Sequence, residues 1–472
     1  MAGNAILVID AGTTSTRAML FAADGTCLGS RQAELVQHHP RSGWVEHDAR
    51  EIWEKSLGCA RAMVEAAGGA DRIGAIGITN QRETILFWSR RTGEPLAPAI
   101  VWQDRRTADL CARLRAEGHE AALQERTGLL LDPYFSASKI AWAMAQWPQL
   151  QEAGDDLAIG TVESWLVWKL TGGLHVSDAT NAARTALMDI RSGLWDAGLL
   201  ELFDVPPHAL PEIVDCAGDF GATEPALFGA AIPILGMAGD QQAAAIGQAC
   251  LRPGETKATY GTGAFVLTHT GASAPVSRHR LLSTVAWQLG GERAYALEGS
   301  VFVAGSLIKW LRDDLGLVVS SAETADIAAS LDDTGGVYLV PAHCGLGAPH
   351  WQPEARGLIS GLTLGARRTH IVRAALEAMA HQTHDLKTAF AADGADWESL
   401  KIDGGMAANN WLAQDLADML ALTVERPRFI ETTALGAAML AGVGSGFFGS
   451  LEEASAMRGP VETFAPNLAD ER

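Results

Sequence analysis

AILVIDAGTTSTR, residues 5–17, begins with an apolar run typical of a buried strand, which ends in Asp10. The Gly, Thr and Ser residues that follow, Gly12 to Thr16, predict a hairpin turn whose successive N–H groups and hydroxyls can cradle an anion. Asp10 offers the hard oxygen ligands that Mg²⁺ prefers. Arg17 is placed to meet a transferred phosphoryl group, although a tight turn with a solvated Arg17 is an equally good interpretation of this segment alone.

Two later segments extend this interpretation. GDQQ, residues 239–242, follows the apolar run Ile232 to Met237 and precedes small residues, which predicts a strand end that presents a carboxylate before a helix. Asp240 is therefore the best candidate in the chain for a general base. YGTG, residues 260–263, predicts a second Gly/Thr turn inside a strand-like run. A carboxylate base, an acidic metal partner and two such turns indicate phosphoryl transfer to an alcohol.

The commonest nucleotide-binding motifs are missing from the sequence. No G-x-x-x-x-G-K-[ST] occurs, and the single D-F-G tripeptide, residues 219–221, has no protein-kinase catalytic loop before it. Gly404 and Gly405, after the strand-like run Leu400 to Asp403, would let a backbone approach a nucleotide closely. For a Gly-Gly pair alone, an ordinary strand-to-helix turn is the commoner explanation.

A polar segment with the character of an acceptor site follows the apolar run Ile73 to Thr79. In this segment, residues 80–84, Arg82 donates and Glu83 accepts, a pair suited to vicinal hydroxyls at the end of a strand. A surface ion pair is the commoner meaning of such neighbours. Trp102 and the segment Asp132 to Phe135 add aromatic and polar groups, which carry little weight by themselves.

Composition narrows the class of protein. A chain of 472 residues with a hydrophobic fraction of 48% is long enough for two well-buried domains. The net charge of -20 disfavours nucleic acid and anionic membranes as partners, because both require clustered Lys and Arg. Six scattered cysteines without a C-x-x-C pair favour a reduced cytoplasm. No signal sequence or membrane-spanning run is recognisable, so we expect a cytoplasmic protein without membrane insertion.

Strand-like and helical segments alternate along the chain, which predicts an α/β fold. The order of elements restarts near Thr256, and each half opens with a strand and a Gly/Thr turn. We therefore predict two domains, residues 1–248 and 249–472. Gly442 to Gly449 is expected to form a loop, and the polar tail beyond Pro460 to be mobile.

Seven segments, in order from about residue 5 to about residue 450, resemble the FGGY carbohydrate kinases, in particular the members that phosphorylate glycerol. These segments are Asp10 to Arg17, Asn80 to Thr84, Trp102 to Arg106, Asp132 to Phe135, Gly239 to Gln242, Tyr260 to Phe265 and Asp403 to Asn410. The resemblance implies two actin-like (ribonuclease H-like) domains with the active site in the cleft between them. It also implies transfer of the γ-phosphoryl group of ATP to glycerol, giving sn-glycerol 3-phosphate in glycerol catabolism.

The same resemblance assigns roles to individual residues. Asp240 matches the catalytic base, and Asp10 matches the acidic residue associated with Mg²⁺. The residues matching the glycerol site are Arg82, Glu83, Trp102, Tyr134, Asp240, Gln241 and Phe265. The residues matching ATP contacts are Thr13, Thr14, Ser15, Arg17, Thr262, Gly305, Lys309, Gly405 and Asn409. A homo-oligomer, either a dimer or a tetramer, is also implied.

Two departures from the family pattern bear on ligands. Lys309 stands where the best-known bacterial members carry Gln, which leaves the type of nucleotide contact open. The segment Phe228 to Ala231 lacks the Gly-rich loop with an Arg that some members use to bind fructose 1,6-bisphosphate, so inhibition by that effector is not expected.

Two other functions are compatible with the pattern. A sister FGGY kinase would phosphorylate a pentulose or another polyol, and the segments at residues 80–84 and 132–135 count against it. An actin-like or chaperone-like nucleotide switch would hydrolyse ATP to change partners. Such a switch has no need of Arg82, Glu83 and Asp240 together.

Overall fold

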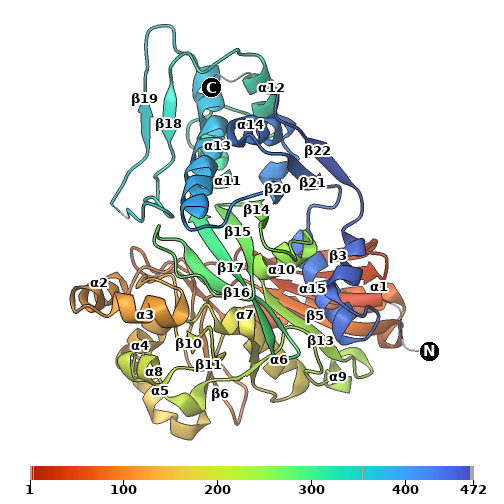
Figure 1. Cartoon of the computed structure of the whole chain (residues 1–472). Helices are drawn as coiled ribbons and strands as arrows, with labels where there is room; N and C mark the ends of the chain where they lie inside the picture. The colour runs from red at the N-terminus through yellow and green to blue at the C-terminus, as the bar shows by residue number, and fades with distance from the viewer. Residues whose placement is uncertain (1–2, 4, 353, 468–472) are drawn as a thin grey trace.

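The computed structural model describes residue 3, residues 5–352 and residues 354–467, and contains two α/β halves, each built on a central sheet (Figure 1). The fold class predicted from the sequence is therefore confirmed. The first sheet has five strands, in the order β13 (Ile234–Gly239), β5 (Ile73–Asn80), β1 (Ala5–Ala11), β2 (Ser15–Ala22) and β3 (Cys27–Glu34).

The topology of this sheet brings distant segments to one edge. β1, β2 and β3 form an antiparallel meander, while β5 and β13 run parallel to β1. Asn80, the last residue of β5, pairs with Ala11 of β1 and with Gly239 of β13. The chain segments that follow these three strand ends therefore begin side by side, as expected where ligands bind an open α/β sheet.

Side-chain alternation along β1 gives the first sheet two buried faces. Leu7 and Ile9 pack into a core that includes Ile52 and Ala60 of α1 (Ala49–Ala67). Ile6 and Val8 point the other way, into a second core built largely from α15 (Thr432–Gly444). The cover of one face thus comes from near the end of the sequence.

Glycines allow α15 to lie unusually close to its neighbours. A Cβ on Gly436 would lie 1.8 Å from the carbonyl oxygen of Ala243, in α10 (Asp240–Gly247). A Cβ on Gly77 of β5 would lie 2.4 Å from the carbonyl oxygen of Ala437. Backbone therefore meets backbone at both contacts, and side chains larger than hydrogen do not fit.

The second sheet repeats the plan of the first with more strands. It has seven strands, in the order β16 (Leu282–Leu289), β17 (Glu292–Val301), β15 (Ala264–Gly271), β14 (Glu255–Tyr260), β20 (Ser399–Asp403), β21 (Val424–Pro427) and β22 (Val461–Phe464). β14 and β15 form an antiparallel hairpin, and β20 runs parallel to β14. The restart of elements predicted near Thr256 corresponds to this second hairpin.

Helices cover the second sheet and complete its core. They are α11 (Gly305–Asp313), α12 (Glu323–Ala329), α13 (Arg368–Ala392) and α14 (Asn410–Leu420). Leu376, Leu386 and Phe390 of α13 pack with Leu400 and Ile402 of β20. The ribbon of β18 (Tyr338–Val340) and β19 (Leu358–Ser360) extends beside α13 (Figure 1).

Further helices of the first half form a third core that includes Leu129, Phe135 and Ile140. They are α2 (Ala108–Ala116), α3 (Glu120–Thr127), α4 (Ser136–Gln146), α5 (Pro148–Glu152) and α8 (Ala197–Leu202). α6 (Val162–Thr171) packs into the core that holds Leu7 and Ile9, and α7 (Ala179–Ala182) into a smaller cluster. β16 reaches down from the second sheet onto α7, where Val285 packs against Ala182 and Met188. The two halves are thus joined by packing as well as by the chain.

Two local expectations were wrong in part. Gly442 was expected in a loop, but α15 continues to Gly444, where a Cβ would lie 2.1 Å from the carbonyl oxygen of Leu235. Gly444 therefore serves close helix-to-sheet packing, and the expected loop begins only at residue 445, where turn residues include Gly446 with a φ of 75°. In the tail beyond Pro460, Val461–Phe464 form β22, which pairs with β21, and residues 468–472 lie outside the described residues. The predicted boundary at residues 248 and 249 falls between α10 and β14 and stays a prediction.

Candidate active site

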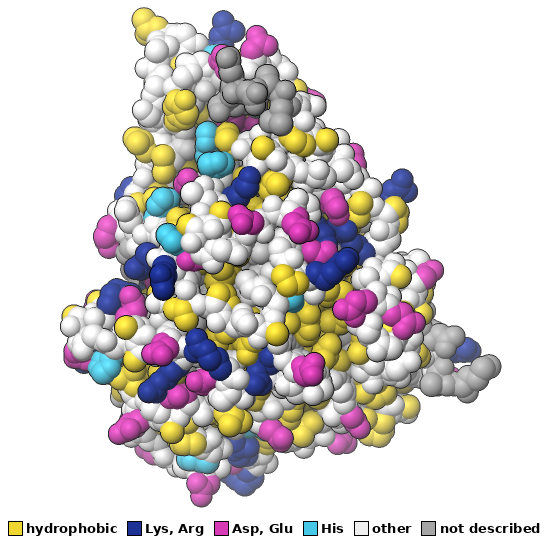
Figure 2. Space-filling view, viewed as in Figure 1, with side chains coloured by type: hydrophobic (Ala, Val, Ile, Leu, Met, Phe, Trp, Pro, Cys, Tyr) yellow, Lys and Arg dark blue, Asp and Glu magenta, His cyan; other side chains and the backbone are white. Residues whose placement is uncertain are grey.

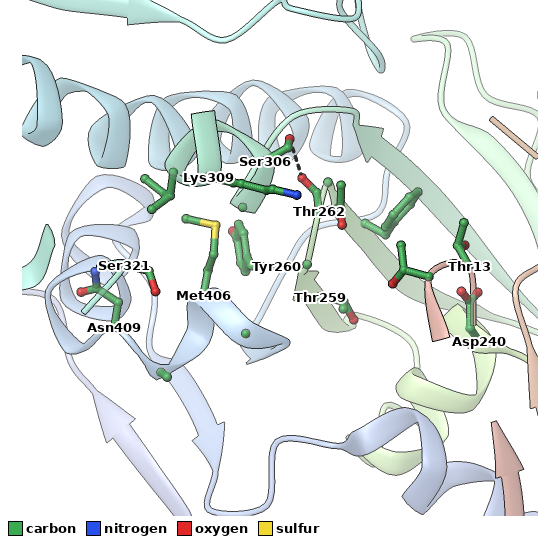
Figure 3. Close-up of a pocket in the computed structure, with 18 of the residues that line it drawn as sticks. Thr13, Asp240, Thr259, Tyr260, Thr262, Ser306, Lys309, Ser321, Met406 and Asn409 are labelled. Atoms are coloured by element: carbon green, nitrogen blue, oxygen red, sulfur yellow. Dashed lines mark hydrogen bonds between the residues drawn. The ribbon is translucent and has the colours of Figure 1, made fainter. Parts of the chain in front are cut away.

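A pocket of about 1170 Å³ lies between the two halves (Figure 3). Most of the residues predicted from the sequence line it, namely Thr13, Thr14, Arg82, Glu83, Trp102, Tyr134, Asp240, Gln241, Thr262, Phe265, Gly305, Lys309, Gly405 and Asn409. Asp10, Ser15 and Arg17 are not among its lining residues. Segments separated by hundreds of residues in sequence therefore meet in one cavity.

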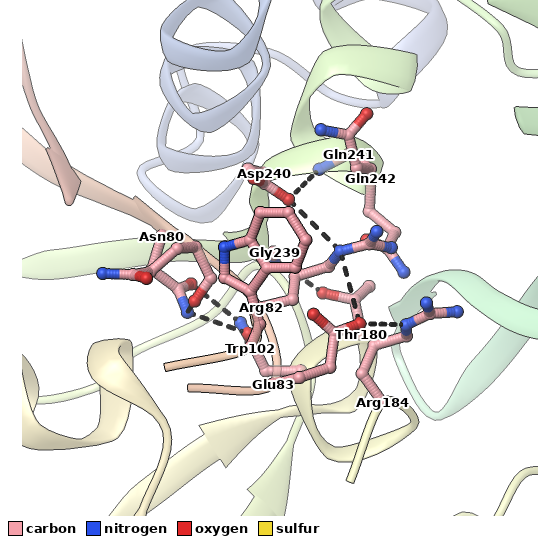
Figure 4. Close-up of polar contacts among 12 residues, drawn as sticks. Asn80, Arg82, Glu83, Trp102, Thr180, Arg184, Gly239, Asp240, Gln241 and Gln242 are labelled. Carbon is pink, nitrogen blue, oxygen red and sulfur yellow. Dashed lines mark hydrogen bonds and ion pairs between the residues drawn. The ribbon is translucent and has the colours of Figure 1, made fainter. Parts of the chain in front are cut away.

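One end of the pocket, which we call the acceptor end after its predicted role, is formed by Arg82, Glu83, Trp102, Tyr134 and Asp240. The Nε of Arg82 lies 3.2 Å from Oδ1 of Asp240 (Figure 4). The backbone of Glu83 has a positive φ of 58°, a strained conformation for a residue other than glycine. Its side chain is buried, with the residue 1% exposed. A donor and two acceptors thus converge within a few ångströms.

Aromatic rings wall this end. The ring centroid of Trp102 lies 5.6 Å from that of Tyr134 and 6.2 Å from that of Phe265, both in edge contacts. Three rings around a compact polar cluster leave room for a small polyhydroxylated molecule with its carbon edge against the rings.

Asp240 begins α10 directly after β13, as the sequence predicted. Its Oδ1 accepts a hydrogen bond from the backbone N–H of Gln241 at 2.7 Å. The side chain keeps 31% exposure, toward the pocket. Burial raises the pKa of Asp240 above its ordinary value, while Arg82 and Lys257 oppose the rise. A carboxylate with a raised pKa at a cleft wall is suited to accept a proton.

Asp10 and Arg17 lie beside the pocket lining and contact each other. The Nε of Arg17 is 3.5 Å from Oδ2 of Asp10, and its Nη1 donates to Oε2 of Glu431 at 2.5 Å. Burial raises the pKa of Asp10 to about 6, Arg17 opposes the rise, and Asp240 and Glu431 add to it. Two carboxylates, Asp10 and Glu431, thus share the guanidinium of Arg17 next to the acceptor end.

The first predicted turn joins β1 to β2 and faces the pocket through Thr13 and Thr14. Oγ1 of Thr13 accepts a hydrogen bond from Nε1 of Trp102 at 2.8 Å. The carbonyl oxygen of Gly12 accepts from Nε2 of Gln81 at 3.0 Å. The turn is therefore held against the acceptor end, while Ser15 and Arg17 belong to β2.

The second turn joins β14 to β15 and rests on the start of α11. The carbonyl oxygen of Thr262 accepts from the N–H and the hydroxyl of Ser306, at 3.1 and 2.9 Å (Figure 3). A Cβ on Gly305 would lie 2.5 Å from the carbonyl oxygen of Gly261, so the close approach requires glycine. Lys309 follows one turn later on α11 and lines the same cavity.

The far end of the pocket is formed by α12, the turn after β20, and the start of α14. Gly404 has a φ of 85°, and a Cβ there would lie 2.6 Å from the carbonyl oxygen of Tyr260. Asn409 caps α14 by accepting from the N–H of Leu412 at 3.1 Å, and its Nδ2 donates to Thr324 at 3.1 Å. The predicted Gly-Gly turn therefore lies where backbone must approach closely.

Buried charged residues next to the acceptor end were not predicted from the sequence. They are Glu298, Arg184 and Lys257, each 0% exposed, whereas Gln242, also 0% exposed, belongs to the predicted segment at residues 239–242. Glu298 interrupts the apolar run of β17, and a lone carboxylate in such a run is the signal that could have found it. The terminal nitrogens of Arg82 donate to Glu298 and to Oε1 of Gln242.

A second buried network supports the ends of β5 and β13. Nδ2 of Asn80 donates to Oε2 of Glu163 at 2.9 Å, and Oγ1 of Thr180 accepts from the N–H of Gly239 at 2.9 Å. Thr180 in turn donates its hydroxyl to Asp178. Burial, followed by the neighbouring Asp178, raises the pKa of Glu163 to about 8. Burial therefore favours the neutral form of this carboxyl group.

The described residues contain neither a metal-binding cluster of side chains nor a membrane-spanning helix. In that part of the chain, no group of three or more His, Cys, Asp or Glu is arranged to hold a metal ion. Nor does any helix there have the length and apolarity needed to cross a membrane. On the face shown in Figure 2, Lys and Arg are interspersed with Asp and Glu.

Comparison with known proteins gives matches over nearly the whole chain. Residues 5–247 match the N-terminal domain of the FGGY family of carbohydrate kinases, and residues 256–445 match the C-terminal domain. A protein of Methylobacterium nodulans named glycerol kinase is 57% identical over 451 residues, covering 94% of this chain and 90% of its own. A glycerol kinase of Rhodospirillum rubrum is 54% identical over 473 residues, covering 99% and 95%.

Solved structures agree with these matches. The crystal structure of Plasmodium falciparum glycerol kinase with ADP superposes with a TM-score of 0.92 at 36% identity, covering 99% of this chain and 95% of that one. A xylulose kinase from Rhodospirillum rubrum superposes with a TM-score of 0.85 at 26% identity, covering 98% and 94%.

Two α/β halves around a pocket with a carboxylate at one end and two Gly/Thr turns along its wall define a kinase of small hydroxylated molecules. Both halves match one family, the first its N-terminal domain and the second its C-terminal domain. The chain belongs to the FGGY family of carbohydrate kinases.

Proposed function

We propose that this protein transfers the γ-phosphoryl group of ATP to glycerol, forming sn-glycerol 3-phosphate and ADP, and so serves glycerol catabolism. The observation that carries the proposal is the convergence of Arg82, Glu83 and Asp240 at one end of the pocket, with Nε of Arg82 3.2 Å from Oδ1 of Asp240. Relatives that share more than half of this sequence are named glycerol kinase, which supports the choice of glycerol among polyols.

In this reaction Asp240 accepts the proton of the attacking hydroxyl as its oxygen forms a bond to the γ-phosphorus. The bond between that phosphorus and the bridging oxygen of ADP breaks, and the electron pair leaves with ADP. Arg82 donates to one hydroxyl of glycerol and Glu83 accepts from another, while Tyr134 and Gln241 border the same space. Trp102 and Phe265 contact the carbon edge.

Glycerol offers little apolar area, so selectivity has to come from hydrogen bonds. A polyol that lacks one hydroxyl leaves a buried site group unpaired, at a cost of roughly 1 to 3 kcal/mol. The ring-lined acceptor end also limits size, which separates glycerol from a pentulose. Movement of the halves toward each other around glycerol would exclude water, the competing acceptor.

The nucleotide is assigned to the other end of the pocket. Thr13, Thr14 and Thr262 present turn N–H groups and hydroxyls to the phosphates, and Gly305, Lys309, Gly405 and Asn409 border the rest of the nucleotide. Ser15 and Arg17 complete the first turn from β2, and Arg17 would approach the γ-phosphoryl group by leaving Glu431. ATP as the phosphoryl donor is consistent with the ADP in the Plasmodium falciparum structure.

The donor set near Asp10 fits Mg²⁺. This ion retains several waters and is usually held by one or two carboxylates together with substrate phosphates, so a cluster of three protein ligands is not required. Asp10 supplies the protein carboxylate, and Asp240 is close enough to raise its pKa. When bound, the ion would neutralise charge on the phosphates; the chain's own contribution is the placement of Asp10 beside the first turn.

The test is ADP release from ATP, with the phosphorylated product identified by mass spectrometry. We expect release to depend on glycerol and the product to be glycerol 3-phosphate. A panel including xylulose and other pentuloses tests the sister-kinase alternative, which a higher kcat/KM for a pentulose would support. ADP release at full rate without any polyol would instead favour a nucleotide switch.

A further inference from the structure

Four charged side chains are buried together beneath the acceptor end. They are Arg82, Glu83, Arg184 and Glu298, with exposures of 2%, 1%, 0% and 0%. Arg82 and Glu83 line the pocket, whereas Arg184 and Glu298 do not. Two cations and two anions balance in charge, so none of the four is an uncompensated buried ion.

In the contacts among the four, Glu298 binds Arg82, and Arg184 binds both carboxylates. Glu298 accepts hydrogen bonds from both terminal nitrogens of Arg82, from Nη1 to Oε2 at 2.6 Å and from Nη2 to Oε1 at 3.2 Å. Arg184 bridges the two carboxylates, with Nη2 donating to Oε1 of Glu298 at 2.8 Å and Nε to Oε1 of Glu83 at 2.7 Å. Bidentate contacts of this kind fix the plane of a guanidinium as well as its position.

The orientation of Arg82 follows from these contacts. Because Glu298 occupies its terminal nitrogens, its Nε is the nitrogen left facing Asp240, and among the described residues this Nε has no hydrogen-bond partner. A buried donor without a partner is costly unless a ligand oxygen satisfies it. Glu83 is an acceptor, and because its Oε1 accepts a hydrogen bond from Nε of Arg184 at 2.7 Å, its Oε2 is the oxygen we assign to a ligand hydroxyl.

Glu298 also links the two halves of the molecule. It lies in β17 of the second sheet, where it pairs in register with Leu267 of β15, whereas Arg82 and Arg184 belong to the first half. β15 begins just after the turn that contains Thr262. β15, which begins at this turn, therefore pairs with the strand that carries the carboxylate contacting Arg82.

We infer that Glu298 and Arg184 are positioning residues for the polyol, Glu298 by orienting Arg82 and Arg184 by holding Glu83. This inference rests on the proposed function, because it explains how the two groups present a donor and an acceptor to adjacent hydroxyls. Neither residue touches the substrate. Each acts through the pocket residue that it holds.

Arg184 and Glu298 act in opposite directions on the pKa of Glu83. Burial raises the pKa of Glu83; Arg82 and Arg184 oppose the rise, and Glu298 adds to it. The pKa of Asp240 is likewise raised by burial and further by Glu298. The other titratable groups that face this cluster are Tyr134, Lys139, Lys257 and Asp10. Removing Arg184 should therefore raise the pKa of Glu83, whereas removing Glu298 should lower the pKa of both Glu83 and Asp240.

The experiment measures glycerol binding to the full-length protein by titration calorimetry between pH 5.5 and 8.5, without nucleotide. At pH 8, we expect Arg184→Met and Glu298→Gln each to raise the Kd for glycerol at least tenfold. Since glycerol needs ionised acceptors, its affinity falls at low pH. This acid limb should move to higher pH in Arg184→Met and to lower pH in Glu298→Gln.

Three further variants separate positioning from folding. Arg184→Met combined with Glu298→Gln restores the charge balance, so it should fold and keep a raised Kd with an acid limb near that of wild type. Arg184→Lys keeps the charge but cannot bridge two carboxylates in the same way, so it should raise the Kd without moving the limb. Glu377→Gln neutralises the partner of another buried arginine, Arg373, outside the pocket lining, and should leave glycerol binding unchanged.

A Kd within twofold of wild type at pH 8 in both single variants, or acid limbs that move in the same direction, would overturn the inference. If both single variants fail to fold, an unchanged Kd in the charge-balanced double variant would do the same. Failure of the wild-type protein to bind glycerol would contradict the proposed function instead.

Discussion

Asp240 is the side chain on which the proposed chemistry depends most directly. We expect Asp240→Asn to lower kcat by roughly 10² to 10⁴-fold, because the amide cannot accept the hydroxyl proton. The KM for ATP should change little, since the proposed nucleotide site lies along the turns. Steady-state assays of both constants check this. Asp219→Asn, at an exposed turn, is the control, and a variant of Asp240 within tenfold of wild type would remove it from the role of base.

Asp10 should give the reaction an acid limb. Its pKa is raised to about 6, so the carboxyl becomes protonated, and its charge is lost, as pH falls through this value. We therefore expect kcat/KM for ATP to decline below pH 6. Glu431 adds to the raised pKa, so Glu431→Gln should move the limb to lower pH. A profile that is flat from pH 7 to pH 5 would contradict the role of an ionised Asp10.

Glu163 should make stability depend on pH in the opposite sense to an ordinary ion-paired carboxylate. Its folded-state pKa of about 8 lies above the ordinary value of 4.5. The stabilising contribution of the proton is complete below pH 4.5 and is lost as pH rises toward 8, because the unfolded chain releases the proton first. Chemical unfolding at several pH values should show wild type losing a few kcal/mol relative to Glu163→Gln over this interval.

The comparison between the two proteins tests the slope and not the absolute stability, since the amide alters hydrogen bonds to Asn80, Thr161 and Ser177. Glu152→Gln, at the exposed end of α5, is the matched control and should have the slope of wild type. Parallel curves for wild type and Glu163→Gln would show that Glu163 is ionised in the folded protein.

The contact between α10 and α15 should tolerate no side chain at Gly436. A Cβ there would lie 1.8 Å from the carbonyl oxygen of Ala243, so α15 must shift away from the helix that begins with Asp240. We expect Gly436→Ala to lower the free energy of unfolding by roughly 1 to 3 kcal/mol despite the better helix propensity of alanine. Thermal unfolding together with kcat measures both consequences.

Gly58 provides the matched control. It lies within α1, and a Cβ there meets nothing within 4 Å. Gly58→Ala should therefore stabilise the protein by up to about 1 kcal/mol through helix propensity alone. Equal effects of the two substitutions would show that the close helix contact is not what Gly436 serves.

Site residues at the ends of strands could be predicted from the sequence. Contacts between residues that meet only through the packing of distant elements could not. Asp10 and Asp240 could be predicted because Asp10 lies near the carboxyl end of the apolar strand β1 and Asp240 directly follows β13. Glu298 lies in the middle of β17, and its partner Arg82 is more than 200 residues away, so no local pattern joins them. The pairing becomes visible only once the two sheets are placed.

The same limit explains why the loop expected from Gly442 to Gly449 begins only after Gly444. Locally, repeated glycines indicate a loop, and their use in close packing depends on what lies beside them. Gly444 continues α15 because the backbone of Leu235 lies directly against it. Packing against β13, a strand about 200 residues earlier in the chain, therefore decides that this segment is helical.

The division of the chain at residue 248 should not give two independent proteins. α15 covers one face of the first sheet, where Ile6, Val8 and Phe21 are buried. We expect residues 1–248 expressed alone to aggregate, and the same fragment joined by a flexible linker to residues 430–446 to be soluble. Co-expression with residues 249–472 should restore activity. A soluble fragment 1–248 with cooperative unfolding would contradict this dependence.

The late position of α15 also has a consequence for synthesis. About 185 residues separate the end of α10 at Gly247 from the start of α15 at Thr432. At ribosomal speeds of 5 to 20 residues per second, roughly 10 to 40 s pass before the nascent first half receives its final helix. During that interval an apolar face of the first sheet is exposed and can contact other nascent chains. We therefore expect a chaperone to protect this face in the cell until translation is nearly complete.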